Sequence, residues 1–140
     1  MDNEKQTGSC LCGVITYEFN KSEALSARHC HCRDCQKITG SGKATILLIP
    51  SNWLTVSGDL KFYTVEGSAG SHVSRGFCSE CGSQLISYVD ENPDLKFIKV
   101  GSIDDSSWVS ISSNFWSSTA NPWSPADDSV HCFTHNPDFA

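Results

Sequence analysis

The stretch CSECG at residues 78–82 decides the fold together with a partner motif, CLCG at residues 10–13. In each motif a glycine follows the second cysteine, and glycine permits the sharp backbone turn that lets two nearby thiolates bind one metal ion. Each motif also precedes an expected strand. A tetrahedral zinc ion held by both motifs would join distant parts of the chain and stabilise a small core. We therefore predict a structural zinc site whose ligands are Cys10, Cys12, Cys78 and Cys81.

A third motif, HCHCRDC at residues 29–35, supplies three thiols within six residues. Three ligands from one short turn leave the fourth position of a tetrahedral zinc ion to water or to a substrate heteroatom. Catalytic zinc sites keep such a position. The pattern therefore predicts a second, catalytic zinc site formed by Cys30, Cys32 and Cys35, and two zinc ions per chain.

A closed second site is the alternative, because four other residues could supply the fourth ligand. If the segment is extended, His29 and His31 point to the face opposite the cysteines. Asp34 can instead accept a hydrogen bond in the turn. Cys132 lies far away in the sequence, and a lone cysteine in a strand is most often a small buried residue. If one of these residues closes the site, the enzyme interpretation weakens.

Short β-rich runs separated by turn residues extend through the chain, whereas amphipathic helical periodicity is interrupted everywhere by Gly, Pro or Ser. We expect strands at Gly13–Phe19, Ala27–Cys30, Ala44–Ile49, Leu60–Val65, His72–Phe77, Gln84–Val89, Phe97–Val100, Val109–Ser113 and Val130–Thr134. Such short, evenly spaced strands predict an all-β sandwich or barrel-like fold, in one domain over residues 1–140. At most a one-turn helix is expected, near Asp34–Ile38 or Asp104–Trp108.

Composition excludes several classes of function. The formal net charge of the 140 residues is −6, and no cluster of Lys and Arg offsets it, so nucleic-acid binding is not expected. Residues 1–6 are polar and lack the apolar core of a signal peptide, and no run is long enough to span a membrane. We therefore expect a cytoplasmic protein, whose clustered cysteines are metal ligands or catalytic groups. Four disulfides in a secreted scaffold are the alternative for eight cysteines.

Residues 117–128, SSTANPWSPADD, are rich in Ser, Pro and Asp and predict a long loop. Trp116 and Trp123 lie at its start and within it. A flexible surface connection is one interpretation. The other is a loop that folds over a site, with its aromatic side chains as a lid or a substrate wall.

Other cysteine and serine chemistry fits the chain less well. The Gly-x-Ser-x-Gly elbow of many serine hydrolases is absent from the sequence. A thioredoxin-like role for Cys32 and Cys35 requires a βαβ context, which the chain lacks. Iron–sulfur ligation by four of these cysteines is the alternative to zinc, but Cys-x-x-Cys-Gly in a β-rich setting favours zinc.

Together these motifs resemble the glutathione-dependent formaldehyde-activating enzyme family, which also contains the centromere protein V type of domain. The matching elements are GSCLCG at residues 8–13, HCRDC at 31–35, TGS at 39–41, FCSECG at 77–82, VGSIDD at 100–105, Trp123 and the closing stretch His131–Pro137. The VGSIDD element is similar to the downstream Gly-x-Leu-Asp-Asp element of the family. The resemblance extends from about Gly8 to Pro137.

The resemblance implies a β-tent fold stapled by zinc, with the structural site at Cys10, Cys12, Cys78 and Cys81. It implies carbon–sulfur lyase activity at Cys30, Cys32 and Cys35. A thiol–aldehyde adduct such as S-hydroxymethylglutathione would be formed or cleaved there. Glutathione carries two carboxylates, and Arg33, Lys37 and Lys43 are candidate contacts for them. A non-catalytic zinc-stabilised interaction module and a thiol or metal sensor are the alternative functions.

Overall fold

The computed structural model describes residues 4–67 and 70–136, so Met1–Asn3 and Pro137 lie outside the described residues. The described chain is mostly β-structure, as expected. It forms two compact units built from interleaved segments. The first unit holds the chain up to Leu25 together with Leu47–Trp108, and the second holds Ser26–Ile46 and the chain from Val109 onward. Strand β4, Ala44–Pro50, carries the chain from the second unit into the first.

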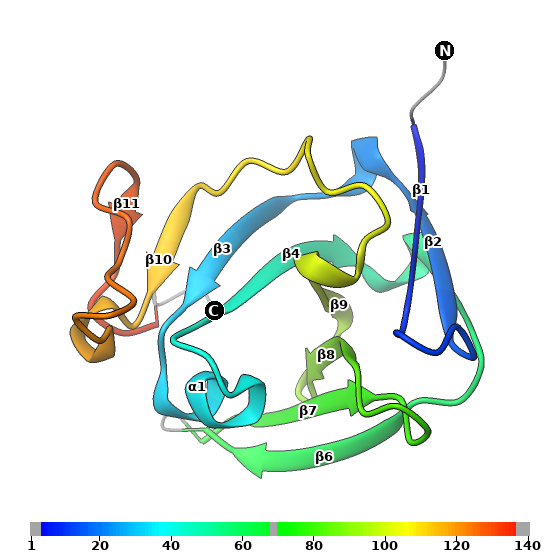
Figure 1. The fold of residues 1–140 in the computed structure, drawn as a ribbon, viewed down its shortest axis with the longest axis horizontal. Helices are drawn as coiled ribbons and strands as arrows, with labels where there is room; N and C mark the ends of the chain where they lie inside the picture. Colours follow the sequence, from blue (N-terminus) through cyan, green and yellow to red (C-terminus); the bar gives the residue numbers. More distant parts are fainter. Residues whose placement is uncertain (1–3, 68–69, 137–140) are drawn as a thin grey trace. The chain divides into compact units, whose positions relative to one another are not determined.

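One sheet of the first unit contains β1 (Lys5–Ser9), β2 (Thr16–Asn20) and β5 (Leu54–Ser57), paired antiparallel in the order β1-β2-β5. The pair β1–β2 is drawn in blue in Figure 1. In β2 the buried residues Tyr17 and Phe19 alternate with exposed polar ones, which is the pattern of a half-buried strand. Strands β1 and β5 were not predicted.

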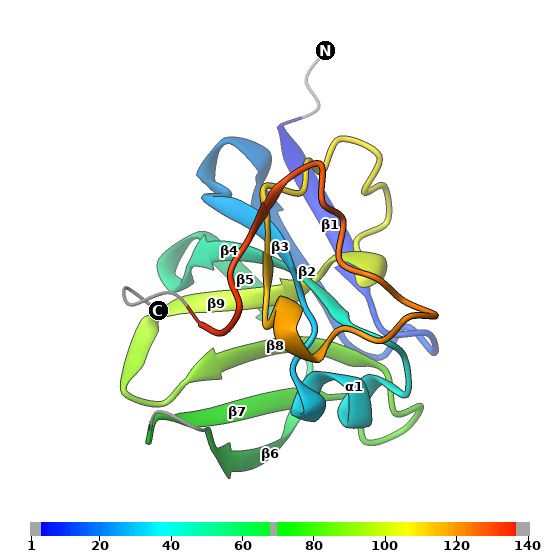
Figure 2. The ribbon, with the colours of Figure 1, turned by 90° about the vertical axis from the view of Figure 1, so that its left-hand side faces the viewer.

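The other sheet of the first unit is a meander of β6 (Lys61–Glu66), β7 (His72–Phe77), β8 (Gln84–Val89) and β9 (Asn92–Lys99), each antiparallel to the next (Figure 2). The predicted bounds of β7 and β8 are confirmed at both ends. Strand β9 begins at Asn92 rather than at Phe97, because Val89 pairs with Asn92 across a tight turn. Proline is tolerated at the start of a strand, so Pro93 does not prevent this pairing.

The core of the first unit consists of apolar side chains from both sheets and the segments beside them. Ile15, Ile49, Leu85 and Ile98 are each at most 1% exposed. A close approach joins β1 to the segment after β9, where Gly8 and Ile103 form an antiparallel bridge. A Cβ atom at Gly8 would lie only 2.2 Å from the Tyr17 ring and 2.6 Å from a backbone oxygen, so this contact requires glycine.

The second unit contains β3 (Ser26–Cys30), α1 (Arg33–Thr39), β10 (Ser113–Phe115) and β11 (His131–Cys132). Strand β10 pairs in parallel with both β3 and β11. The predicted strand Val109–Ser113 is wrong except for its last residue, because pairing with β3 starts only at Ser113. The predicted strand Val130–Thr134 is reduced to two residues.

Helix α1 is longer than the single turn expected near Asp34–Ile38. Cys32 is its N-cap, and Gly40 ends it in the left-handed conformation with φ of 70°. The other expected helical turn, Asp104–Trp108, is irregular chain that ends in a turn. Short 3₁₀ helices lie at Lys21–Glu23, Ser51–Trp53, Val100–Ser102 and Ser117–Thr119. Within the described part of the chain, every helix is too short or too polar to cross a membrane.

Two candidate metal centres

The first centre brings together the four sulfur atoms of Cys10, Cys12, Cys78 and Cys81, all within 4.8 Å of one another. The Sγ atoms of Cys10 and Cys12 are 3.6 Å apart, and those of Cys12 and Cys78 are 3.8 Å apart. A tetrahedral zinc ion with Zn–S bonds of about 2.3 Å places its sulfurs about 3.8 Å apart. The four thiols therefore fit a zinc ion in both number and spacing.

Two tight turns of the same kind position these thiols. In the first turn the backbone N–H of Gly13 donates to the carbonyl of Cys10 at 3.1 Å, and in the second Gly82 donates to Cys78 at 2.8 Å. Both glycines have positive φ, 83° and 79°, a conformation that other residues rarely adopt. The glycine after each cysteine pair is thus needed for the turn that brings the sulfur atoms close together.

Hydrogen-bond donors surround the sulfur atoms of the first centre. The backbone N–H groups of Ile15 and Glu80 donate to the sulfurs of Cys10 and Cys78 at 3.3 and 3.4 Å. Donors directed at sulfur stabilise the thiolate, the form that binds metal. Although burial acts to raise it, the hydrogen bond from Ile15 helps to lower the pKa of Cys10. The backbone hydrogen bond of Val14 acts to lower the pKa of Cys12, but burial and the neighbouring thiols raise it to about 12.

Ser83 links the two motifs and was missed by the sequence analysis. Its hydroxyl accepts from the backbone N–H of Leu11 at 2.9 Å and lies 3.2 Å from the sulfur of Cys81. The hydroxyl hydrogen bond is the main reason that the pKa of Cys81 is lowered to about 5. The sequence offers only the position of Ser83 directly after the Cys-x-x-Cys-Gly turn as a signal for this role.

The second centre lies in the second unit and consists of three thiols whose sulfurs are also within 4.8 Å of one another. Cys30 ends β3, Cys32 caps α1, and Cys35 lies in the first turn of that helix. Figure 1 shows β3 leading into α1. Cys30 is 9% exposed, whereas Cys32 and Cys35 are partly exposed. A soft, three-thiolate donor set of this kind suits zinc and leaves one tetrahedral position to another ligand.

Crowding of the three sulfurs shapes the acid–base behaviour of the second centre. Hydrogen bonds with Cys32 and Cys35 are the main reason that the pKa of Cys30 is strongly raised, and burial adds to the effect. Without a cation, three neighbouring thiolates would repel one another, so the Cys30 thiol stays protonated. Loading a divalent metal there must therefore release protons.

The four residues that the sequence left open as a fourth ligand lie outside this cluster. The ring of His29 hydrogen-bonds to the Thr45 hydroxyl at 2.8 Å through Nδ1. His31 is fully buried, with Nε2 at 3.1 Å from the side-chain oxygen of Asn114. Asp34 is exposed in the first turn of α1. Among the residues that the structure describes, the second cluster therefore contains three cysteines and no other ligand.

Cys132 was expected to be a buried small residue, and this expectation is wrong. It lies in the two-residue strand β11 and is exposed. Its sulfur is 3.5 Å from the side-chain nitrogen of Asn114 rather than in the second cluster. All eight cysteines are free, so the structure contains none of the disulfides of the secreted-scaffold alternative.

Gln36 ties the long loop to the cysteine segment, a role that the sequence analysis did not detect. Its side chain is 5% exposed and donates to the carbonyls of His31 and Thr119 at 2.8 and 3.0 Å. Asn121 in turn donates to the Gln36 side-chain oxygen at 3.0 Å. The Thr119 hydroxyl donates to the same His31 carbonyl at 2.8 Å. The first part of the loop is therefore fixed beside the backbone that joins Cys30 to Cys32.

The turn at residues 121–124 presents Trp123, which is 69% exposed, to solvent. The next residue, Ser124, packs so closely on Gly42 that an added Cβ there would lie 2.2 Å from the Ser124 Cβ. Trp116 is only partly exposed, and its indole N–H donates a hydrogen bond to the side-chain oxygen of Asn136 at 2.9 Å. Of the two expected loop aromatics, Trp123 is therefore the one that a ligand can reach.

Three basic residues were expected to contact carboxylates near the second centre. Arg33 donates to the side-chain oxygen of Gln36 and is exposed, as is Lys37. Lys43 is partly exposed and contributes to lowering the pKa of His29, although burial is the larger cause. All three remain candidate contacts, and the hydrogen bond of Arg33 also supports Gln36.

The number of metal ions per chain tests the two centres directly. We expect two zinc ions in native mass spectrometry of protein prepared with zinc, because each cluster presents enough thiols for its own ion. Cys35→Ser should reduce the count to one, whereas Cys132→Ser should leave it at two. A single zinc ion in the unmodified protein would contradict the second centre.

Comparison with known proteins places these centres in context. A family model described as "Glutathione-dependent formaldehyde-activating enzyme" matches residues 5–119, a segment that includes all seven clustered cysteines. No significant match is found among curated proteins. A crystal structure of a protein from Rhodobacter sphaeroides, a structural-genomics target, is similar with a TM-score of 0.57 and 21% sequence identity. The similarity covers 91% of this chain and 99% of that one, and at this identity it supports the fold alone.

Proposed function

The chain belongs to the glutathione-dependent formaldehyde-activating enzyme family, and on this premise we propose that it is a zinc-dependent carbon–sulfur lyase. The proposed reaction forms or cleaves thiol–aldehyde adducts of the S-hydroxymethylglutathione type. The thiol S–H adds across the aldehyde C=O, so that an S–C bond forms and the thiol proton ends on oxygen. Cleavage is the reverse. The first centre would hold a structural zinc ion and the second a catalytic one.

The observation that carries this proposal is the difference between the two centres. Four thiols complete a tetrahedral site, whereas Cys30, Cys32 and Cys35 supply only three ligands. When bound at the second centre, a zinc ion would supply a position at which a substrate thiol is held as its reactive thiolate. Cys32 and Cys35 are partly exposed, so a small thiol can approach them.

Two residues beside the second centre have the contacts expected of residues that position its cysteines. The buried Gln36 and Thr119 both donate to the carbonyl of His31, the residue between Cys30 and Cys32. These bonds hold the backbone that presents two of the three thiols. We assign Trp123 as a wall for the bound adduct, and Arg33 and Lys37 as contacts for the carboxylates of glutathione.

The same proposal includes a β-tent description of the fold, a single domain over residues 1–140 and a cytoplasmic location. Free thiols that serve as metal ligands persist in a reducing compartment, which supports the cytoplasmic location.

A reversible thiol sensor at Cys30, Cys32 and Cys35 is the competing function favoured by the same three neighbouring sulfurs. It predicts that mild oxidant forms an internal disulfide among them, which thiol counting would detect.

Exchange spectroscopy tests the proposed activity. Glutathione and ¹³C-formaldehyde equilibrate with their adduct in buffer, and NMR measures the rate of interconversion. We expect zinc-loaded protein to raise this rate at least tenfold, and chelator-treated protein or free zinc to leave it near the buffer value. A rate unaffected by the zinc-loaded protein would contradict the lyase and favour the alternative of a non-catalytic interaction module.

A further inference from the structure

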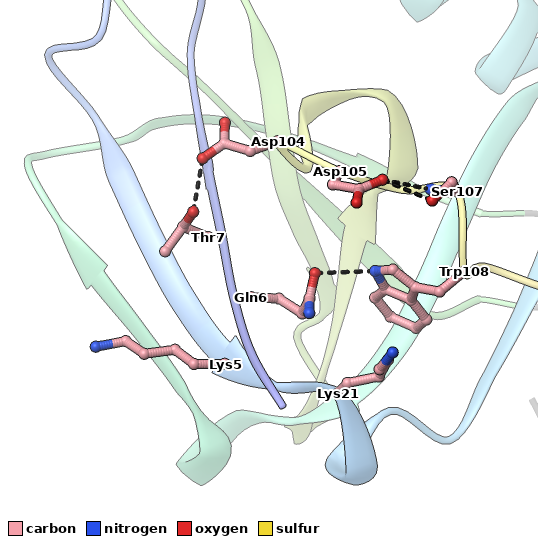
Figure 3. Close-up of a pocket in the computed structure, with 8 residues that line it drawn as sticks. All are labelled: Lys5, Gln6, Thr7, Lys21, Asp104, Asp105, Ser107 and Trp108. Carbon is pink, nitrogen blue, oxygen red and sulfur yellow. Dashed lines mark hydrogen bonds between the residues drawn. The ribbon is translucent and has the colours of Figure 1, made fainter. Parts of the chain in front are cut away.

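A cavity of about 330 Å³ lies in the first unit and is not lined by any of the clustered cysteines. It is lined by the start of β1, by Lys21 and by the segment from Asp104 to Trp108 (Figure 3). This segment includes the last two residues of the VGSIDD element, an element that contributes no ligand to either metal centre. The volume is at the small end of the range of ligand pockets, about 300–1,000 Å³.

One wall of the cavity is an aromatic side chain held in place by a buried amide. The indole N–H of Trp108 donates to the side-chain oxygen of Gln6 at 2.9 Å, and Gln6 is only 8% exposed. The Trp108 ring also packs against Phe19, with ring centroids 6.2 Å apart. The wall is therefore built before any ligand arrives, which reduces the entropy cost of binding.

Two carboxylates lie along one side of the cavity (Figure 3). The backbone N–H of Asp104 donates to the Thr7 carbonyl at 2.8 Å, and the Thr7 hydroxyl donates to Oδ2 of Asp104 at 2.6 Å. Oδ1 of Asp105 accepts from the hydroxyl and the backbone N–H of Ser107 at 2.7 and 3.0 Å. These hydrogen bonds use one oxygen of each carboxylate and fix its orientation. Among the residues that the structure describes, the second oxygen of each is left for a ligand.

Two ammonium groups lie on the other side of Gln6 from these carboxylates (Figure 3). The Nζ atom of Lys21 is 5.4 Å from the centroid of the Trp108 ring, within the range of a cation–π interaction. The Nζ atom of Lys5 is 3.0 Å from a carboxylate oxygen of Glu18, on the neighbouring strand. The cavity thus presents both signs of charge, separated across an aromatic and amide floor.

We propose that this cavity binds a zwitterion, a free amino acid or a short peptide. The ligand ammonium group would pair with Asp104 and Asp105, and its carboxylate with Lys21. A simple anion would be repelled by the two carboxylates, and a simple cation would make no favourable contact with Lys21, the lysine of the lining that is not paired with Glu18. A ligand with both charges satisfies both sides, and charge-assisted hydrogen bonds of this kind are stronger than neutral ones. None of the clustered cysteines lines this site, so it is distinct from both cysteine centres.

Gly8 explains how the carboxylates reach the cavity. The bridge between Gly8 and Ile103 lays the VGSIDD element onto β1, next to Thr7. A side chain at Gly8 would collide with the Tyr17 ring, so the element can dock only on glycine. The hydroxyl of Ser102, within the same element, hydrogen-bonds to that of Tyr17 at 2.6 Å. The bridge and the bonds to Thr7 therefore hold Asp104 against β1, and the bonds to Ser107 orient Asp105 within the irregular segment that follows.

Titration followed by ¹H–¹⁵N NMR tests the proposal, with the full zinc-loaded chain and glycylglycine as the probe. We expect the Trp108 indole N–H signal to shift, because this group lies in the wall of the cavity. N-acetylglycylglycine lacks the ammonium charge and glycylglycinamide lacks the carboxylate, so each should bind at least tenfold more weakly. Equal binding of all three peptides, or displacement of glycylglycine by equimolar acetate, would overturn the proposal.

Matched variants locate the site. Lys21→Gln and Asp105→Asn should each weaken glycylglycine binding about tenfold, whereas Lys61→Gln and Asp59→Asn, which change exposed residues elsewhere, should not. The amide spectrum of each variant reports whether the fold persists, and Asp104→Asn provides a second test of the carboxylate side. Unchanged binding in the cavity variants would overturn the assignment. So would the absence of any shift with glycylglycine and glycylphenylalanine at about 10 mM.

Discussion

Replacing Cys78 by serine is expected to destabilise the first unit by about 2–4 kcal/mol and to lower its melting temperature. Cys78 is 1% exposed, and its sulfur lies 3.8 Å from that of Cys12, which is 66 residues away in the sequence. A cross-link that closes a loop of this length stabilises a fold by about 4 kcal/mol through loop-closure entropy. Metal–thiolate bonding adds to this contribution. Domains are stable by only about 5–15 kcal/mol in total, so weakening this cross-link, in which only Cys81 still joins Cys10 and Cys12, removes a substantial part of that margin.

Circular dichroism and thermal melting measure this effect, with Cys132→Ser as the matched control. Cys132 is exposed and lies outside both clusters, so its replacement should leave the melting curve unchanged. Excess chelator added to the unmodified protein removes the ion altogether and should lower the melting temperature at least as much as Cys78→Ser does. If Cys78→Ser melts at the temperature of the control, the first centre does not stabilise the fold.

The strands that the sequence predicts well are those whose buried positions are apolar or lie between clear turn residues. Strands β7 and β8 match their expected bounds because turn residues mark their ends. Residues Ser79–Ser83 separate the two strands, and a turn follows Val89 at the end of β8. The spaced cysteine motifs likewise carry the family resemblance, which the family model confirms. Metal-ligand spacing and tight turns are local properties, so a single sequence records them.

Polar residues or glycine at buried positions explain why the sequence did not reveal β1 and β10. Strand β1 directs Gln6 and Gly8 inward, and neither residue gives a hydrophobic pattern. Strand β10 contains Asn114, which is fully buried because its amide bonds to His31 and to the carbonyl of Asp127. Only a folded chain satisfies such a side chain, so local periodicity could not place it. The roles of Gln36 and Ser83 depend on tertiary partners in the same way.

Replacing Cys32 by serine is expected to remove the proposed activity while the fold persists. The second centre joins residues only five positions apart, Cys30 to Cys35, so its loop-closure contribution is about 2 kcal/mol, half that of the first centre. The Cys32 sulfur caps α1 by accepting from the Cys35 backbone N–H at 3.2 Å. Serine is among the best N-cap residues, so the helix should be retained. The variant should bind one zinc ion per chain.

With a ligand of the second centre removed, the rate of adduct exchange should fall at least a hundredfold toward the buffer value, because the enzyme interpretation depends on the thiol being held at that centre. Cys132→Ser should keep the full rate. The comparison separates catalysis from folding, since melting reports the first centre and exchange reports the second. Retained exchange in a Cys32→Ser protein that binds a single zinc ion would show that the reaction does not depend on the second centre. The sensor function would then be the alternative for the three-thiol cluster, and a disulfide that mild oxidant forms between Cys30 and Cys35 of this variant would support it.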